Sequence, residues 1–381
     1  MKCYKELRKE KNAALLLHHK IWYNYPYNSI DRTEGLYMSQ SKKNLLYVGI
    51  LILLIAVTFY FIFRSYDLGE TMRVLHTAEK KWIILAIIAN LAFLLIGALN
   101  LKLVLRSIGK KVRIIKTLKY VLVETYFCAV TPSASGGQPM EMLEMKRDGI
   151  AFSSSTIALI VIAIAYKAML LVYAAGMFVM ARNGILDSLG SLRWLFKLGI
   201  VMNLGAVAFM MMALFCGDVF RKAMLGILQF VDGIHPLKKY DAYVDKINYL
   251  MKNYREGAAY ILKHRKTFYL VLFMTFIQRA CRFAVTYMIY RSFGLKEASL
   301  VTIILMQAIV SVAADMMPIP GAVGISETCY LRIFKSAFGS SFLVPSMVLS
   351  RGISFYGVVV ISGLVVVLLQ IGSITIKKGK K

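Results

Sequence analysis

The sequence predicts an all-α polytopic membrane protein with six full spans plus two re-entrant half-helix hairpins in a pseudo-inverted repeat. Three observations predict this fold class. Of 381 residues, 58% are hydrophobic and only 18% are charged, with a mean hydropathy of +0.62, so a bilayer is the natural solvent. Apolar stretches long enough to cross a bilayer at about 1.5 Å per residue recur along the chain. Two Pro/Gly-rich breaks interrupt apolar segments at corresponding places in the two halves.

The spans and hairpins follow from the apolar stretches and the breaks. The six spans are expected at roughly 44–63, 82–105, 154–182, 194–216, 268–292 and 345–371. Two further apolar segments, 118–150 and 299–338, carry the breaks at residues 131–139 (TPSASGGQP) and 318–324 (PIPGAVG). Unwound backbone at membrane depth is tolerated only where protein or a water-filled cavity surrounds it. Each segment is therefore expected to be a hairpin of half-helices that contributes to a shared transport path.

The order span, span, hairpin, span occurs twice and defines two repeats. Three full crossings per half is an odd number, so the second half is expected to be inverted relative to the first. The predicted domains are a basic cytoplasmic extension at 1–43, a transmembrane domain at 44–371 and a basic cytoplasmic tail at 372–381. Met38 is a candidate start within the extension. The transmembrane domain contains repeat one at about 44–182 and repeat two at about 194–371, with a basic amphipathic segment at 217–267.

The distribution of Lys and Arg predicts the orientation. With the N-terminus in the cytoplasm, 32 of them fall on the cytoplasmic side and 11 on the opposite side, so both termini are expected inside. The first hairpin then enters from the cytoplasm and the second from outside, so the two breaks can meet near the midplane. The net charge of +27 is attributed to cytoplasmic loops and anionic lipid headgroups, and no nucleic-acid partner is expected.

Ionisable side chains inside the membrane are the sharpest functional signal. Each costs about 2.5 to 3.5 kcal/mol at a helix centre unless it finds a partner. A phosphate suits the basic set, and counter-ions, a cationic headgroup or coupling protons suit the acidic set. In the alternative, these charges pair with each other, for instance Glu124 with Lys167 or Asp315 with Arg279, and lock the hairpins. The basic set is Lys167, Arg279, Arg282 and Arg351, the last near the outer end of its span, and the acidic set is Glu124, Asp315 and Glu327.

The breaks themselves supply small and polar groups. Their glycines permit left-handed backbone, and a half-helix that restarts after Gly324 would point free N–H groups and the positive end of its dipole at an anion. The alternative for any single Gly or Pro is a tight interhelical turn. The candidate binding residues of the breaks are Gly136, Gly137, Gly321 and Gly324, with Ser133, Ser135, Gln138 and Ser326 as neutral hydrogen-bonding groups.

Catalysis, metals and cofactors find no support in the sequence. The five histidines lie outside the apolar spans, so Ser135 lacks a base and no His-ligated metal is expected inside the membrane. Asp315 lacks a second aspartate in a span, and no Walker sequence occurs. The five cysteines are scattered without a CxxC pair. We therefore predict no catalytic residue, no metal and no cofactor.

Several motifs of the chain resemble those of one known family. Residues 131–139 followed by 146–150 (KRDGI), residues 318–321 with Gly324 and Glu327, and Arg351 followed by 354–356 (SFY) are similar to the lysylphosphatidylglycerol synthase transmembrane family. The resemblance covers about 44 to 371 and is specific at the first break. The second break departs slightly, because Ala322 and Val323 stand where a glycine-richer run is usual.

The resemblance implies a lipid flippase-like transporter in a bacterial cytoplasmic membrane. The family includes the membrane half of the bacterial multiple peptide resistance factor, which moves lysyl-phosphatidylglycerol to the outer leaflet and weakens binding of cationic antimicrobial peptides. In full-length relatives, a cytoplasmic domain makes that lipid from lysyl-tRNA. No soluble segment here exceeds about 50 residues, so such a domain is not expected. The alternatives are a phosphatidylglycerol lysyltransferase, or its membrane subunit or scaffold. Expected partners are membrane phospholipids, with a separate lipid-synthesising enzyme and a second copy of the chain as further candidates.

Overall fold

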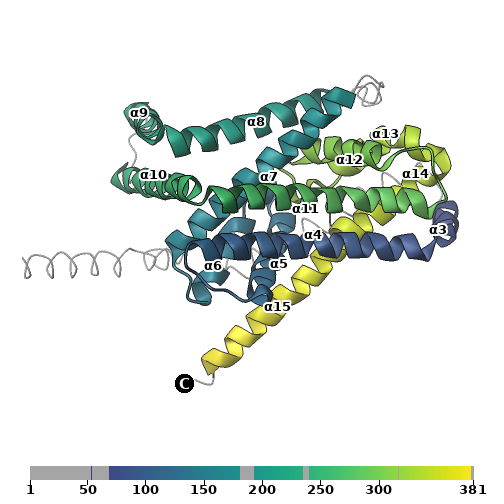
Figure 1. The fold of residues 1–381 in the computed structure, drawn as a ribbon, viewed down its shortest axis with the longest axis horizontal. Coiled ribbons are helices and arrows are strands. Elements are labelled where there is room, and N and C mark those ends of the chain that lie inside the picture. The colour runs from purple at the N-terminus through teal and green to yellow at the C-terminus, as the bar shows by residue number, and fades with distance from the viewer. Residues whose placement is uncertain (1–52, 54–67, 181–192, 235–239, 316, 379–381) are drawn as a thin grey trace, which may run out of the picture. The chain divides into compact units, whose positions relative to one another are not determined.

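Helices make up every regular element that the structure describes. The structure is a computed structural model that describes Leu53 and residues 68–180, 193–234, 240–315 and 317–378, all in the unit Ile50–Lys381 (Figure 1). The extension predicted at 1–43 lies outside the described residues, and Leu53 alone is described from the span predicted at 44–63. The helices are α3 (Leu68–Thr77), α4 (Lys80–Ser107), α5 (Ile114–Val130), η2 (Pro132–Ala134), α6 (Gly137–Arg147), α7 (Phe152–Met180), α8 (Arg193–Phe215), α9 (Gly217–Ile234), α10 (Tyr240–Lys263), α11 (Arg265–Ser292), α12 (Leu300–Ala314), η5 (Pro320–Ala322), α13 (Ile325–Ile333), α14 (Lys335–Arg351), η6 (Gly352–Tyr356) and α15 (Gly357–Lys378).

Four stretches within the described residues are long and apolar enough to cross a membrane. They are Lys80–Ser107, Phe152–Gly176, Arg265–Ser292 and Lys335–Leu369. These stretches correspond to four of the predicted spans and support a polytopic membrane protein. The last one begins earlier than predicted, because the chain turns from α13 directly into α14 at Phe334. The span predicted at 194–216 is the helix α8, whose apolar part, Phe196–Met212, is shorter than the other four.

Large apolar side chains cover the outer faces of these helices. On α4 and α15 they are more than two-fifths exposed, which is unfavourable in water and favourable in lipid. The side chains are Ile84, Leu85, Ile87, Ile88, Leu91 and Leu95 on α4, and Val360, Ile361, Leu364, Val367 and Leu368 on α15. The fold therefore leaves an apolar exterior that suits a bilayer.

The two halves share one order of elements: a long helix, a helix, a break, a helix and a long helix. In the first half this order is α4, α5, η2, α6 and α7, and in the second it is α11, α12, η5, α13 and α14 with α15. The equivalent long helices α4 and α11 lie side by side over their length (Figure 1). They are antiparallel, because the N–H of Glu79 before α4 donates to the carbonyl of Ser292 at the end of α11, at 2.8 Å.

Each break contains a short helix, η2 or η5, that begins with a proline and contains left-handed backbone. In η2, Ser133 and Ala134 have φ of 51° and 54°, and in η5, Gly321 and Ala322 have φ of 59° and 48°. Proline cannot continue the preceding helix, and left-handed residues redirect the chain. α5 then packs on α6, and α12 packs on α13, so each break is the turn of a hairpin. The two breaks also lie in contact with each other, although they are far apart in the sequence.

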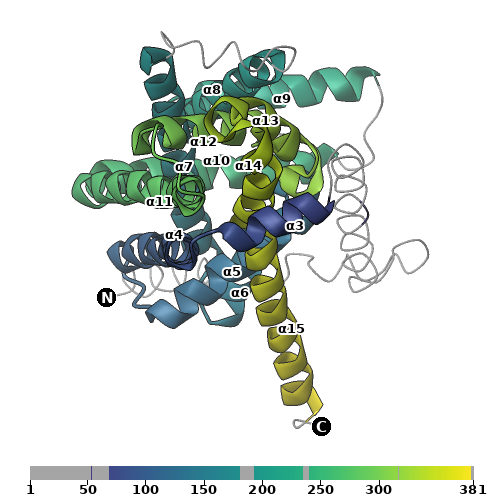
Figure 2. The ribbon, with the colours of Figure 1, turned by 90° about the vertical axis from the view of Figure 1, so that its right-hand side faces the viewer.

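The amphipathic segment predicted at 217–267 contains two helices, α9 and α10. α9 exposes Ile227 and Phe230, and α10 packs against α7 and α8. α9 continues from the end of α8 (Figure 2). Arg255 of α10 forms an ion pair with Asp218 of α9 at 2.7 Å. Helix α9 was missed because it follows almost directly on the apolar α8, while the apolar residues whose helical spacing marked the segment begin at Tyr240, the first residue of α10.

Candidate functional site

The second break lies against the helix that follows α14. Gly321 has φ of 59°, and a Cβ at this position would overlap the ring of Phe355. Only glycine therefore allows both the left-handed backbone and this close approach. The carbonyl of Gly321 accepts a hydrogen bond from NH2 of Arg351 at 3.2 Å, which attaches the break to the end of α14.

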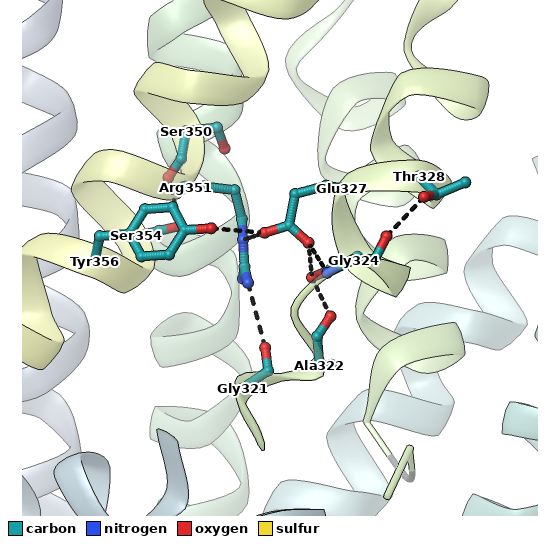
Figure 3. A network of polar contacts seen from close by, with 10 residues as sticks. Gly321, Ala322, Gly324, Glu327, Thr328, Ser350, Arg351, Ser354 and Tyr356 are labelled. Atoms are coloured by element: carbon teal, nitrogen blue, oxygen red, sulfur yellow. Dashed lines mark hydrogen bonds and ion pairs between the residues drawn. The ribbon is translucent and has the colours of Figure 1, made fainter. Parts of the chain in front are cut away.

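Glu327, on the first turn of α13, is the centre of the polar contacts around this break. Its side chain is fully buried, and it accepts four hydrogen bonds (Figure 3). Oε1 accepts from Nε of Arg351 at 2.7 Å and from the hydroxyl of Tyr356 at 3.0 Å. Oε2 accepts from the N–H of Gly324 at 2.8 Å and from the hydroxyl of Ser326 at 3.2 Å. The N-terminus of α13 therefore already holds an anion, the carboxylate of Glu327.

A polar cavity of about 110 Å³ adjoins this network. We call it the arginine cavity. It is large enough for a phosphate-sized group or several water molecules. Its lining comes from α11, α12, the second break, α13 and the end of α14: Arg282, Phe283, Thr286, Gln307, Val310, Ser311, Ala314, Gly321, Ala322, Ser326, Tyr330, Ser350, Arg351 and Ser354.

Arg282 is the cation of this cavity that has no carboxylate partner among the described residues. Its NH1 donates to Oδ1 of Asn90 at 2.9 Å, and its guanidinium lies 4.8 Å from the ring centre of Phe93. The amide nitrogen of Asn90 donates to the carbonyl of Ile353 at 2.9 Å, which fixes its oxygen toward Arg282. A neutral amide orients the guanidinium without neutralising it.

Further donors face the arginine cavity. Thr286 donates to Oε1 of Gln307 at 3.0 Å and lies 3.0 Å from the hydroxyl of Ser350. Because the amide oxygen of Gln307 accepts the hydrogen bond from Thr286, its N–H groups are available to a ligand. Within the described residues, neither these N–H groups nor the hydroxyl of Ser311 donates a hydrogen bond. Since Glu327 neutralises Arg351, the wall of the cavity carries one net positive charge, from Arg282. The arrangement can bind a singly charged anion.

A second charged cluster, which we call the lysine cluster, lies between α7, α8 and α12. Lys167 forms an ion pair with Asp315 and donates to Oδ1 of Asn203 at 3.1 Å. The hydroxyl of Tyr166 lies 3.4 Å from the other oxygen of Asp315. From the sequence, Lys167 was considered as an ion-pair partner of Glu124, and Asp315 as one of Arg279. The structure pairs Lys167 with Asp315, because α7 and α12 pack directly on each other.

Arg279 is buried beside this cluster without a hydrogen bond. It is 5% exposed, and its Nε and NH2 have no acceptor within the described part of the chain. Its guanidinium lies flat on the ring of Tyr166, with Cζ 3.3 Å from the ring centre. Asp315, Glu124 and Arg282 all lie within its electrostatic reach.

The groups predicted on the first break lie apart from the arginine cavity. Ser133, Ser135 and Gln138 are exposed, and Gly137 is buried against Cys128 and Glu124. The N–H of Gly136 donates to the hydroxyl of Thr131 at 2.9 Å, which closes the turn.

The structure thus brings only part of the predicted set together. Arg282, Arg351, Gly321 and Ser326 line the cavity, while Gly324 and Glu327 support it. Lys167 and Asp315 form the lysine cluster with Arg279 beside it, and Glu124 lies on the first hairpin. Uncharged polar residues of apolar helices were missed, and their signal was an amide or hydroxyl in an otherwise apolar stretch. They are Asn90, Asn203, Thr286, Gln307, Ser311 and Ser350.

Comparison with known proteins gives two matches. The family model described as "Lysylphosphatidylglycerol synthase TM region" matches residues 46–362. A protein described as "UPF0104 membrane protein", from Archaeoglobus fulgidus, is 22% identical over 316 residues, which are 81% of this chain and 92% of that protein.

Proposed function

Because the chain belongs to the lysylphosphatidylglycerol synthase transmembrane family, we propose that it is a lipid flippase-like transporter. Its substrate would be an anionic or aminoacylated phospholipid of the lysyl-phosphatidylglycerol type. It would act in the bacterial cytoplasmic membrane, and movement of such a cationic lipid to the outer leaflet would contribute to resistance against cationic antimicrobial peptides. No residue of the chain would act as a catalyst, and no cofactor would be needed.

The arginine cavity is the observation that carries this proposal. Arg282 has a guanidinium in a polar cavity and no carboxylate partner within the described residues. The phosphodiester of a phospholipid carries a single negative charge, which matches the one positive charge that Arg282 leaves unbalanced. Donors from Gln307 and Ser311 would complete the coordination of the phosphate oxygens. Arg351 would serve as a gate, since it connects the cavity wall to the second break.

The contact between the two breaks supports a transport path. If both hairpins are re-entrant and enter from opposite faces, contact between η2 and η5 places the two interruptions at one depth. A headgroup could then pass along polar backbone and side chains instead of lipid tails. The recurring element order and the antiparallel α4 and α11 fit an inverted repeat, the plan of many secondary transporters.

The direct test is lipid translocation in proteoliposomes. Arg282→Ala is expected to reduce flipping of labelled lysyl-phosphatidylglycerol by at least tenfold, and Arg282→Lys to retain part of it because the charge remains. Arg291→Ala is the matched control on the same helix, since Arg291 lies over Trp82 away from the cavity. Undiminished flipping by folded Arg282→Ala protein would remove the proposed role of the cavity.

A second measurement separates transport from lipid synthesis, the activity that the name of the family suggests. Purified protein is incubated with lysyl-tRNA and phosphatidylglycerol, and the lipids are analysed by mass. No lysyl-phosphatidylglycerol is expected to form. Its formation by this chain alone would replace the flippase with a lysyltransferase.

A further inference from the structure

Two acidic side chains on the first hairpin, one buried and one half-buried, lie without a hydrogen bond among the described residues. Glu124 lies on α5 and Glu141 on α6, and Glu141 is only 1% exposed. Among the described residues, neither carboxylate accepts a hydrogen bond or forms an ion pair, and Oε2 of Glu141 has no contact with solvent. A buried carboxylate without a partner is costly when charged, so this arrangement calls for a compensating ligand.

The packing of α5 on α6 brings these two side chains near each other. Gly137 lies directly against Glu124, since a Cβ on Gly137 would come within 3.2 Å of Cγ of Glu124. Glu141 is four residues further along α6, and residues four apart share one face of a helix. The charge of Glu124 consequently acts on Glu141.

Arg279 provides an independent observation at the same place. Its side chain is 95% buried, its Nε and NH2 lack acceptors within the described residues, and Glu124 lies within its electrostatic reach. Asp315 also faces Arg279, but Lys167 already neutralises it. Cys128, on α5, is the other titratable group whose electrostatic surroundings include both carboxylates.

We propose that Glu124 and Glu141 form a proton-binding pair that shares one proton and couples lipid movement to a proton gradient. The coupling rests on the proposed function, whereas the proton site does not. Two carboxylates and the guanidinium of Arg279 leave one excess negative charge, which one proton neutralises. Adjacent carboxyl groups in a low-dielectric environment cannot both stay ionised. A metal is less suitable, because no three His, Cys, Asp or Glu side chains gather at a site within the described residues.

Arg279 also connects this pair to the arginine cavity. Arg282 is three residues further along α11, and the two guanidinium charges act on each other. An anion bound at Arg282 would add negative charge and raise the affinity of the pair for its proton. Because linkage is reciprocal, a proton on the pair raises the affinity of the cavity for an anion by the same factor. Anion affinity should therefore increase as pH falls, by at most about tenfold per pH unit for one proton.

The proton itself can be detected by infrared spectroscopy of the full chain in phosphatidylcholine vesicles. Wild-type protein at neutral pH is expected to show the C=O stretch of a buried carboxylic acid, which Glu141→Gln and Glu124→Gln each remove. Glu144→Gln is the matched control, because Glu144 lies on the same helix and pairs with Lys119 and Arg147. Absence of the band in wild-type protein, or its persistence in both variants, would overturn the proton site whatever the flipping assay shows.

The coupling is tested with dimethyl phosphate, a phosphodiester whose single negative charge stays constant between pH 6 and pH 8. Wild-type affinity for dimethyl phosphate is expected to increase as pH falls over this range, by up to about a hundredfold. Glu141→Gln should bind tightly at both pH values, and Glu144→Gln should follow the wild type. A wild-type affinity that does not change with pH would overturn the coupling. Unchanged dimethyl phosphate binding by Arg282→Ala would instead contradict the arginine cavity, while the infrared band still decides the carboxyl pair.

Discussion

Glu327 and Arg351 show what a buried ion pair does at the second break. Glu327 is fully buried and accepts hydrogen bonds from Arg351 at the end of α14, from Tyr356 at the end of η6 and from two groups at the start of α13. Arg351 also binds the carbonyl of Gly321, so the pair attaches the break to the end of α14. A pair of this kind stabilises one geometry more than it stabilises the fold, because desolvation offsets most of the attraction.

Glu327→Gln is therefore expected to be strongly destabilising, although it preserves the shape of the side chain. It leaves the Arg351 guanidinium buried without a counter-charge, which costs about 3–5 kcal/mol. Thermal unfolding of the purified protein in detergent measures the change. Glu297→Gln, at an exposed position between α11 and α12, is the control and should stay within about 0.5 kcal/mol of the wild type.

A double variant distinguishes loss of the pair from loss of a single group. Adding Arg351→Gln to Glu327→Gln removes the uncompensated charge, so the double variant is expected to be more stable than the sum of the two single changes predicts. Additive effects would show that the two side chains act independently, against the network described.

At the scale of elements, an ionic contact outside the four long apolar helices closes the first hairpin. Asp148 follows α6, and it accepts hydrogen bonds from Lys119 at 2.9 Å and from Tyr120 at 2.6 Å, both on α5. Lys116 lies 3.5 Å away. Burial alone would raise the pKa of Asp148, but the hydrogen bonds from Tyr120 and Lys119 and the two lysine charges outweigh burial and hold its pKa below the ordinary value of 3.8.

The lowered pKa gives a pH dependence with a definite sign. The ionised Asp148 stabilises the hairpin fully above about pH 3.8, and this contribution is lost as pH falls through the lower pKa of the folded state. Asp148→Asn is therefore expected to speed hydrogen exchange in α5 and α6 at neutral pH, relative to the wild type at the same pH. The difference should disappear in strong acid.

The control for this prediction is Asp241→Asn, an exposed position in the first turn of α10. It should leave exchange in α5 and α6 unchanged at every pH. An equal rate for wild type and Asp148→Asn at neutral pH would show that the contact does not close the hairpin.

Features that depend on the local sequence could be predicted, and those that depend on the packing of distant helices could not. Pro132 follows the end of α5, and Pro320 begins η5 six residues after α12 ends, so the prolines marked both breaks in the sequence. The start of α14 was missed, because Pro345 lies inside that helix and the chain turns at Phe334 without a strong local signal. The partner of Lys167 depends on how α7 packs on α12, which one-dimensional periodicity does not determine. For the same reason Arg282 was predicted as a binding residue, but its cavity and the amide of Asn90 were not.

On the scale of the whole molecule, the antiparallel contact of α4 with α11 fixes which connections share a side. α4 has 28 residues, or about 42 Å at about 1.5 Å per residue, which exceeds a hydrocarbon core of about 30 Å. The connection 108–113 follows the end of α4, and the connection 293–299 follows the end of α11. Because the two helices are antiparallel, these connections must lie on opposite sides of the membrane if both helices cross it.

Cysteine labelling tests this topology and the predicted orientation together. Single cysteines at the exposed positions Lys110 and Glu297 are introduced into a variant whose five native cysteines are replaced by alanine. The connection 108–113 carries three basic residues and should be cytoplasmic, so Lys110→Cys should react with an impermeant maleimide only after the cells are permeabilised. Glu297→Cys should react in intact cells.

The reverse pattern would keep the crossings but overturn the orientation, whereas labelling of both positions from the same side would contradict the crossing of α4 or α11. The cysteine-free protein must remain unlabelled in both conditions and must retain the wild-type unfolding midpoint, which shows that the background itself is folded.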